Sequence, residues 1–284
     1  MRSRTMFQSA VLGASLFAGL ASAVVAVPAI AKTTKVGGIY AVSVAGFRFA
    51  EGRLSLVVQN DAYSAKLDMH SSGLGRLFSS GKGNAEATGW LRRSHVTPAR
   101  YDLRSNSGKR DATKVSMALN RGAVRKLAVS PKLRKVPDRI PVTKRHKRNI
   151  LDPLSAVLFP ATGREAKLDA SACKRTIPVF DGWTRYDVKF SYKGTREVKN
   201  PDYQGTVVVC GARWVPVAGH RPHKVSVKKM ADNRTMEAWL APVGDLPLFV
   251  PYRISMETNM GPLVVEARRL RMVGEQKQAA AVNE

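Results

Sequence analysis

The two cysteines are the first residues whose chemistry the sequence limits. Cys173 and Cys210 lie 37 positions apart (210 − 173), which is not the C-x-x-C spacing of thioredoxin-like redox sites. Two thiols alone also cannot supply the four ligands of a structural zinc ion. An even number of cysteines in an exported protein is typical of disulfides, so we predict a Cys173–Cys210 bond. It would close a loop of about 38 residues and stabilise the fold by roughly 4 kcal/mol.

Side chains that could catalyse a reaction or bind a metal form no recognisable motif. His220 and His223 could provide two metal ligands, but no acid or third histidine stands beside them, so we predict no metal site. Glu237 and Glu266 fall within strand-like patterns and could point into a cavity. The sequence has no G-x-S-x-G, G-x-G-x-x-G or G-x-x-x-x-G-K-[ST] motif for a nucleophile or a bound phosphate. These features favour a protein that is not an enzyme and uses no cofactor.

Five aromatic side chains in the C-terminal half are the candidates for contact with an apolar ligand. They could line a cavity for an acyl chain, or they could simply fill the core of a sheet. The second interpretation is favoured, because large β domains bury such rings routinely. The five residues are Trp183, Tyr186, Trp214, Trp239 and Tyr252.

A strong positive charge dominates the composition. The chain has 47 Lys and Arg against 21 Asp and Glu, a formal net charge of +26, which attracts anionic partners. Eleven of the cations fall between Arg121 and Arg148, where Asp138 is the one acid and prolines recur. Because proline interrupts helices, we predict an extended basic loop that crosses the fold over residues 121–150.

This basic loop could be a solvated connection, or it could contact an acidic surface. In an exported protein the available polyanions are anionic lipid, lipopolysaccharide and acidic envelope proteins. Nucleic acid is not an expected partner, and contact with a membrane would be peripheral only. The candidates for anion binding are Arg134, Lys135, Lys144, Arg145, Lys147 and Arg148.

The elements that must position these residues are mostly strands. From Gly37 onward, apolar and polar residues alternate in short runs separated by Gly, Asn, Asp and Pro, which is typical of strands with one buried face. We therefore predict an all-β fold with a long, curved, mostly antiparallel sheet, either an open barrel or β-spiral-like. One β-rich domain over residues 32–275 is favoured, and a division into two halves at the basic loop is the alternative.

One segment predicts a helix. Asp152 is a good N-cap, Pro153 suits the first helical position and Pro160 ends the segment. Because so short a helix is unstable alone, we expect it to be buried against the sheet.

Three other segments carry local predictions. Asp181-Gly182 predicts a two-residue hairpin turn between two strands. The alternation in KVSVKKM, residues 224–230, predicts a further strand. Residues 73–81, GLGRLFSSG, break the strand pattern and predict a short, turn-like helix.

The N-terminus predicts export. Two arginines precede an apolar, uncharged run, Met6–Ala31, which ends in the small-x-small pattern of a signal peptidase site. We therefore predict a cleaved signal over residues 1–31 and a periplasmic protein. Cleavage after Ala23 or an uncleaved membrane anchor are the alternatives. Residues 276–284 are predicted to form a flexible tail.

Several segments together resemble domain-of-unknown-function family 3108, a family of exported proteobacterial proteins. The matching segments are YAVSVAGFRFAEGRLSL, LDPLSAVL, CKRTIPVFDGWTRYDVKF, YQGTVVVCGARWVPVAGH and LPLFVPYRISMETNMGPLVVEA. This resemblance implies an exported, β-rich protein and brings no established activity. The predicted sheet is also similar to periplasmic β-spiral envelope-integrity proteins and to lipoprotein carriers, a likeness of fold that warrants little about function.

Export, charge and the lack of catalytic motifs favour one function. We expect a periplasmic, non-enzymatic binding or scaffold protein that supports the cell envelope. Its sheet would hold an apolar or anionic ligand, or a segment of a partner. The alternative is a hydrolase that acts on envelope polymers, with polar groups brought together from distant strands.

Overall fold

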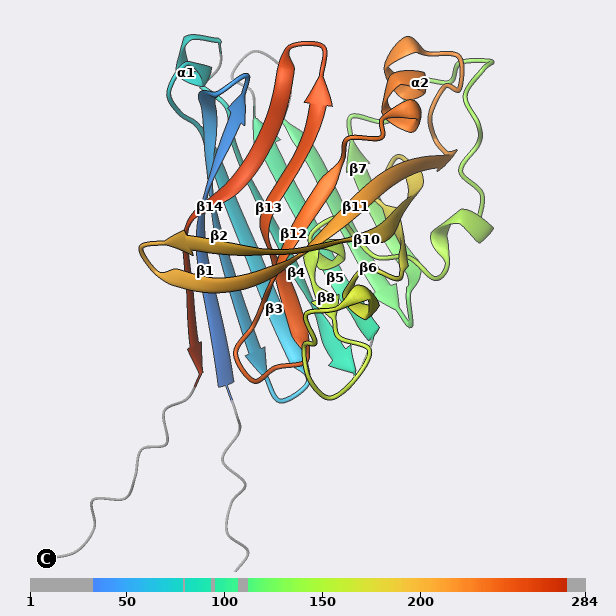
Figure 1. The fold of residues 1–284 in the computed structure, drawn as a ribbon. Helices are drawn as coiled ribbons and strands as arrows, with labels where there is room; N and C mark the ends of the chain where they lie inside the picture. The colour runs from blue at the N-terminus through green and yellow to red at the C-terminus, as the bar shows by residue number, and fades with distance from the viewer. Residues whose placement is uncertain (1–32, 79, 93–94, 107–111, 275–284) are drawn as a thin grey trace, which may run out of the picture. The chain divides into compact units, whose positions relative to one another are not determined.

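Strands dominate the computed structural model of this chain and form one antiparallel sheet of 14 strands (Figure 1). The structure describes residues 33–78, 80–92, 95–106 and 112–274. The predicted signal (1–31) and the predicted tail (276–284) lie outside these residues. The described residues belong to the unit Ala31–Glu284, and none of their helices is long and apolar enough to cross a membrane.

Each half of the chain is a meander, and the pairing of β1 with β14 joins the two halves. The strands of the first half are β1 (Thr33–Val44), β2 (Phe47–Gln59), β3 (Ala62–Ser71), β4 (Lys82–Arg92), β5 (His95–Asn106), β6 (Thr113–Asn120) and β7 (Ala123–Ser130). Those of the second half are β8 (Phe159–Pro160), β9 (Thr176–Phe180), β10 (Arg185–Asn200), β11 (Tyr203–Ala218), β12 (Glu237–Pro242), β13 (Leu248–Thr258) and β14 (Gly261–Gly274).

Alternating residues of these strands fill the core. In β2, Leu54, Leu56 and Val58 are buried, and the residues between them are more exposed, because successive side chains of a strand point to opposite faces. The all-β, mostly antiparallel fold predicted from this alternation is confirmed. The sheet is open, since the order of its strands ends at β7 and β9.

The segment predicted as a short buried helix forms a single 3-10 turn, η2 (Ser155–Val157). Asp152 caps it as predicted, because its Oδ1 accepts the backbone N–H groups of Leu154 at 3.0 Å and Ser155 at 2.8 Å. The turn ends early because strand β8 follows directly and pairs with β13. The segment is therefore buried as predicted, but its helix is shorter.

The strand predicted for residues 224–230 is wrong, because this segment forms the helix α2 (Val225–Asp232). Its two alternating valines resemble a strand, but lysine, methionine and alanine are good helix formers. The turn-like helix predicted further upstream is confirmed as α1 (Gly75–Phe78). Two more 3-10 turns are η1 (Arg145–Lys147) and η3 (Ala170–Ala172).

Strands β9 and β10 form the predicted hairpin, but their turn has four residues, 181–184, and not two. Asp181 stabilises this longer turn: its Oδ1 accepts the N–H groups of Trp183 at 2.8 Å and Thr184 at 2.6 Å. Gly182 has a φ of +103°, and a Cβ there would lie only 3.0 Å from a side-chain carbon of Val115 in β6. The turn therefore packs tightly against the other edge of the sheet.

The basic loop is shorter than predicted, because residues 123–130 form the edge strand β7. This strand pairs with β6 along its length. Leu127 and Val129 pack against the core, whereas Arg125 and Lys126 are exposed. The many charged residues therefore obscured the alternation of this strand in the sequence. The loop starts only at Pro131.

The end of the basic loop connects the two edges of the sheet. The backbone N–H of Ile150 donates to the carbonyl of Gly122 in the β6–β7 turn at 3.0 Å. Leu151 donates to Pro178 at 2.8 Å and accepts from Phe180 at 2.9 Å, so it bridges to β9. We call residues 149–151 the bridging segment. It ties the edges together although β7 and β9 do not pair.

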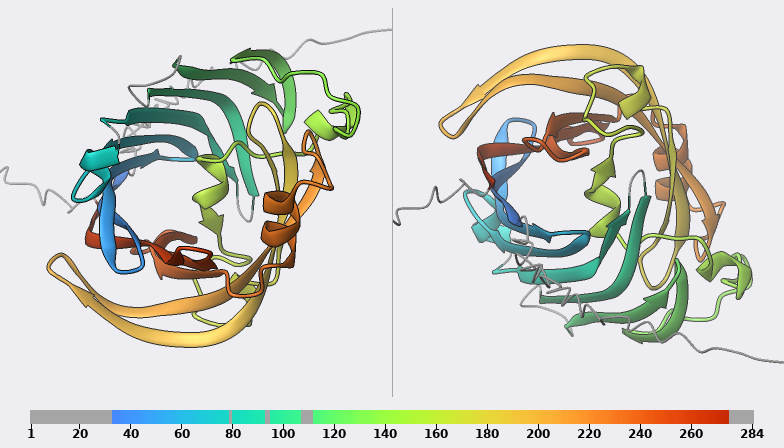
Figure 2. Two further views of the ribbon diagram at one scale, coloured as in Figure 1. Left: turned by 90° about the horizontal axis from the view of Figure 1, so that it is seen from above. Right: turned by 90° about the horizontal axis from the view of Figure 1, so that it is seen from below.

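The β10–β11 hairpin is much longer than β9 and extends beyond it. Figure 2 shows its far end as an outer arc beyond β13 and β14. The side-chain amide of Asn200 donates to the carbonyl of Ala267 at 3.2 Å, and the rings of Tyr203 and Tyr252 lie 6.0 Å apart. These contacts hold the end of the hairpin against the outside of the sheet.

Candidate ligand-binding site

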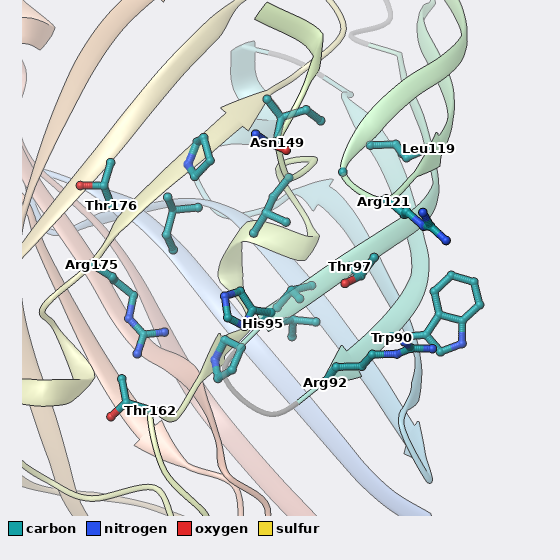
Figure 3. A pocket seen from close by; sticks show the side chains of 18 of the residues that line it. Trp90, Arg92, His95, Thr97, Leu119, Arg121, Asn149, Thr162, Arg175 and Thr176 are labelled. Atoms are coloured by element: carbon teal, nitrogen blue, oxygen red, sulfur yellow. The ribbon is translucent and has the colours of Figure 1, made fainter.

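A cavity of about 1250 Å³ lies where the bridging segment meets the strands on either side of it (Figure 3). Its walls come from the end of β4, the start of β5, the β6–β7 turn, the bridging segment and the approach to β9. Ligand pockets in proteins typically measure about 300–1,000 Å³. The cavity is therefore large enough for an organic molecule of considerable size.

Apolar side chains form much of the lining. Leu119, Ile150, Leu158 and Ile177 belong to the core and also face the cavity. Trp90, near the end of β4, adds an aromatic ring to the lining, and this residue is 44% exposed to solvent. Such a lining favours an apolar portion of a ligand.

The ionisable side chains that the structure describes in the lining are all basic. Figure 3 shows Arg175 on one side of the cavity and Arg92 and Arg121 on the other. Among the described residues, the lining includes no Asp or Glu. Because arginine and lysine side chains attract anions, the lining favours an anionic group on the ligand. The basic residues are Arg92, His95, Arg121, Lys174 and Arg175.

Arg175 is the least exposed of these basic residues. Its side chain is partly buried, and burial lowers the pKa of its guanidinium from the usual value. The Nε–H has no hydrogen-bond acceptor among the described residues. The guanidinium carbon lies 5.8 Å from the centre of the Phe159 ring, a favourable but weak contact. Arg175 thus carries a partly desolvated charge, and no acidic side chain of the described residues forms an ion pair with it.

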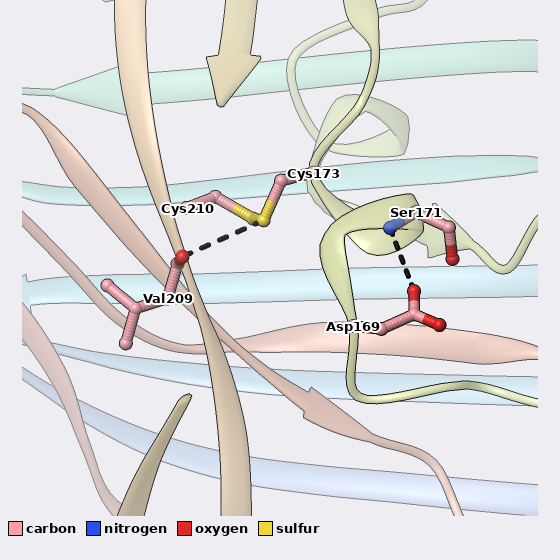
Figure 4. Close-up of a disulfide and its surroundings, with 5 residues drawn as sticks. All are labelled: Asp169, Ser171, Cys173, Val209 and Cys210. Carbon is pink, nitrogen blue, oxygen red and sulfur yellow. Dashed lines mark hydrogen bonds between the residues drawn. A yellow bond between two sulfur atoms is a disulfide. The ribbon is translucent and has the colours of Figure 1, made fainter. Parts of the chain in front are cut away.

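A disulfide fixes the chain just before Arg175 (Figure 4). The sulfur atoms of Cys173 and Cys210 lie 1.93 Å apart, at bonding distance, as predicted from their number. Both residues are fully buried. The carbonyl of Arg175 accepts the N–H of Phe190 in β10 at 2.9 Å. These bonds anchor the segment that carries two of the cavity's cations.

The turn before the disulfide has its own cap. Asp169 accepts the backbone N–H of Ser171 at 2.8 Å at the start of η3, as Figure 4 shows. Hydrogen bonds to Ser171 lower the pKa of the Asp169 carboxyl. The carbonyl oxygen of Val209 lies 3.7 Å from the sulfur of Cys173, so β11 packs directly against the turn.

The five aromatic residues considered as ligand contacts do not line this cavity. Trp183 donates from Nε1 to the carbonyl of Pro131 at 2.9 Å. The other four pack against neighbours on the sheet: Tyr186 lies 5.8 Å from Trp214, Trp239 lies 5.1 Å below the guanidinium of Arg253, and Tyr252 lies beside Tyr203. Among the described lining residues the aromatic one is Trp90, and no local pattern distinguishes it in the sequence.

The six basic residues proposed for anion binding do not line this cavity either. They lie in the loop between β7 and the bridging segment and are exposed or half-buried. Lys147 lines a smaller pocket of about 200 Å³ together with Trp183. The six residues are Arg134, Lys135, Lys144, Arg145, Lys147 and Arg148.

The two glutamates considered for catalysis are paired with basic side chains, and His220 packs against an aromatic ring. Glu237 accepts from Lys193 at 2.7 Å, and this bond lowers the pKa of its carboxyl. Glu266 accepts from Arg253 at 2.6 Å. His220 is buried 5.8 Å from the Trp214 ring, and burial lowers its pKa. Among the described residues, no group of three or more His, Cys, Asp or Glu could hold a metal ion.

Comparison with known proteins identifies a family and no activity. No curated protein matches the chain. A solved structure of a beta-barrel-like protein of domain of unknown function DUF1849 from Brucella abortus is similar at a TM-score of 0.44 and 9% identity, covering 86% of this chain and 98% of that one. The family described as "Protein of unknown function (DUF3108)" matches residues 39–268. That match spans most of the sequence and confirms the resemblance of its segments, so this chain belongs to the DUF3108 family.

Proposed function

We propose that this protein is an exported, non-enzymatic binding protein of the cell envelope that holds an amphiphile with an anionic head group. One observation carries the proposal: the cavity has an extensive apolar lining, and the ionisable side chains among its described residues are all basic. The apolar portion of the ligand would contact Leu119, Ile150 and Ile177. Its head group would lie near Arg175.

The state of Arg175 supports an anionic head group. Burying part of a guanidinium without an acceptor costs free energy. A carboxylate or phosphate oxygen would accept a charge-assisted hydrogen bond from the guanidinium and restore the lost solvation. A neutral apolar ligand would leave that cost in place. The ligand class that fits both features is therefore an anionic amphiphile such as a fatty acid or a phospholipid.

The binding test uses protein purified from cells that express the full sequence, with cis-parinaric acid and its methyl ester as fluorescent probes. The acid should bind roughly 10- to 100-fold more tightly than the ester, because hydrogen bonds to charged groups contribute about 1.5–3 kcal/mol. Arg175→Gln should weaken binding of the acid by a similar factor and leave the ester unchanged. Arg213→Gln, an exposed position on β11, is the matched control and should change neither.

A second variant tests the cavity and not its charge. Thr97→Trp places a bulky ring in the lining and should weaken both probes. Native mass spectrometry of the same preparation should find an anionic lipid bound to the wild-type protein. Equal affinity of wild type and Arg175→Gln for the acid would contradict the proposal. Fractionation that finds the protein only in the cytoplasm would contradict its place in the envelope.

A further inference from the structure

The loop after β7 and the segment that contains α2 lie side by side. The N–H of Ile140 donates to the carbonyl of His220 at 3.1 Å, and the N–H of Gly219 donates to that of Ile140 at 2.8 Å. Arg221 forms an ion pair with Asp138 at 2.8 Å. We call the surface formed by residues 131–148 and 221–234 the basic face. Its two segments are held together by backbone bonds, so their charges act jointly.

The basic face has a large excess of positive charge. Its two segments contain 13 Lys and Arg against two acids, Asp138 and Asp232, a formal balance of +11 (13 − 2). One of the acids is already neutralised by Arg221. The cations are Lys132, Arg134, Lys135, Arg139, Lys144, Arg145, Lys147, Arg148, Arg221, Lys224, Lys228, Lys229 and Arg234. Such a concentration of one sign attracts extended anions.

Exposed apolar side chains lie among these cations. Val225 at the start of α2 is 65% exposed, and Leu133 in the loop is 41% exposed. The helix α2 has no buried residue, so burial in the core does not explain its formation. A short helix with lysines and exposed valine suits the interface of a bilayer, where lysines meet head groups and apolar side chains enter the boundary.

We propose that the basic face docks the protein on the surface of an anionic phospholipid bilayer. The charges would provide most of the affinity, and Leu133 and Val225 would enter the head-group region. A soluble polyanion could also engage the charges, but it would gain nothing from the two apolar side chains. The proposal rests on a surface separate from the cavity, and it holds whether or not the cavity binds an amphiphile.

Co-sedimentation with vesicles tests this docking. Protein purified from cells that express the full sequence is mixed with vesicles of phosphatidylcholine alone, or with added phosphatidylglycerol. Binding should require phosphatidylglycerol and decrease as salt is raised. Neutralising three lysines should weaken it roughly 100-fold, since each lysine near an anionic surface contributes about fivefold. The test variant combines three substitutions at the start of α2 and within it, Lys224→Gln, Lys228→Gln and Lys229→Gln. The matched control combines three substitutions on strands β1, β4 and β10, Lys35→Gln, Lys82→Gln and Lys199→Gln.

Two further variants separate the possible outcomes. A loop variant (Arg134→Gln, Lys135→Gln, Lys144→Gln) should lose affinity as the α2 variant does. The proposal can therefore still be tested if one of these two variants fails to fold. Leu133→Ser with Val225→Ser should weaken binding to vesicles but not to heparin, the soluble polyanion used for comparison. Equal binding to neutral and anionic vesicles, loss in the control equal to loss in the α2 variant, or binding to heparin but not to vesicles would overturn the proposal.

Discussion

Asp152 should make the stability of the fold depend on pH. Its carboxyl group is fully buried and accepts hydrogen bonds from the N–H groups of Leu154 and Ser155 and from the hydroxyl of Ser155. That hydroxyl lies 2.6 Å from the hydroxyl of Tyr63. These hydrogen bonds favour the charged form, but burial has the larger effect and raises the pKa of Asp152 from 3.8 to about 6.

The sign of the effect follows from these two pKa values. The folded protein holds the proton more tightly than the unfolded chain, so Asp152 favours folding most at low pH. Its contribution decreases as pH rises from the unfolded pKa, 3.8, through the folded pKa, about 6. The difference of 2.2 pKa units (6 − 3.8) corresponds to about 3 kcal/mol at about 1.36 kcal/mol per unit. About half of that loss should have occurred by pH 5.

Asp152→Asn removes the titration and keeps a hydrogen-bond acceptor at the same place. The free energies of unfolding of both proteins are measured in urea at pH 4, 5, 6 and 7. Between pH 4 and pH 7 the difference between them should move by about 2.4 kcal/mol in favour of the variant, because all other groups titrate alike in both proteins and part of the total of about 3 kcal/mol is already lost at pH 4. Asp68→Asn, at an exposed position, controls for the substitution itself. A difference that stays constant across this range, or moves in the opposite direction, would refute the reasoning.

Three other substitutions test the packing by urea denaturation. Replacing both Cys173 and Cys210 by serine should lower the free energy of unfolding by about 4 kcal/mol, and two free thiols in the untreated wild-type protein would contradict the disulfide. Gly182→Ala should cost roughly 1–3 kcal/mol because of its positive φ and close neighbours, whereas Gly163→Ala, with open space around it, should cost much less. Leu56→Ala, at a fully buried position, should cost about 2–5 kcal/mol; a loss below about 1 kcal/mol would contradict its place in the core.

The strands could be predicted because burial of one face makes apolar and polar residues alternate along the sequence. Leu54, Leu56 and Val58 show the alternation directly, and the structure confirms it. The same rule failed at α2, where Val225 and Val227 alternate on a helix that buries no residue in the core. A pattern of period two indicates a strand only if another strand is available to pair with it. The sequence around α2 does not contain that information.

The disulfide could be predicted and the cavity could not, for a common reason. Two cysteines have only each other as partners, so their number alone determines the pairing. The cavity is lined by residues from Trp90 to Pro178, and it forms only when the bridging segment connects the β6–β7 turn to β9. Trp90 and Arg175 have no local pattern that distinguishes them. Their proximity depends on pairing between segments far apart in the sequence.

Net charge alone does not single out a binding site in this protein. With 47 cations and 21 acids, at least 26 cations (47 − 21) must lack an acidic partner of their own, so an unpaired, exposed lysine is expected anywhere on the surface. Water solvates such a group at little cost. Arg175 differs because it is partly buried and lines the apolar cavity, and its Nε–H, like those of Arg139 and Arg253, has no acceptor among the described residues. Arg139 and Arg253 each bond through Nη1, Arg139 to the carbonyl of Gly219 and Arg253 to Glu266 at 2.6 Å, whereas the Arg175 guanidinium makes no such bond among the described residues. This contrast among three partly buried arginines, and not the total charge, is the reason for proposing the cavity as the place for an anionic head group.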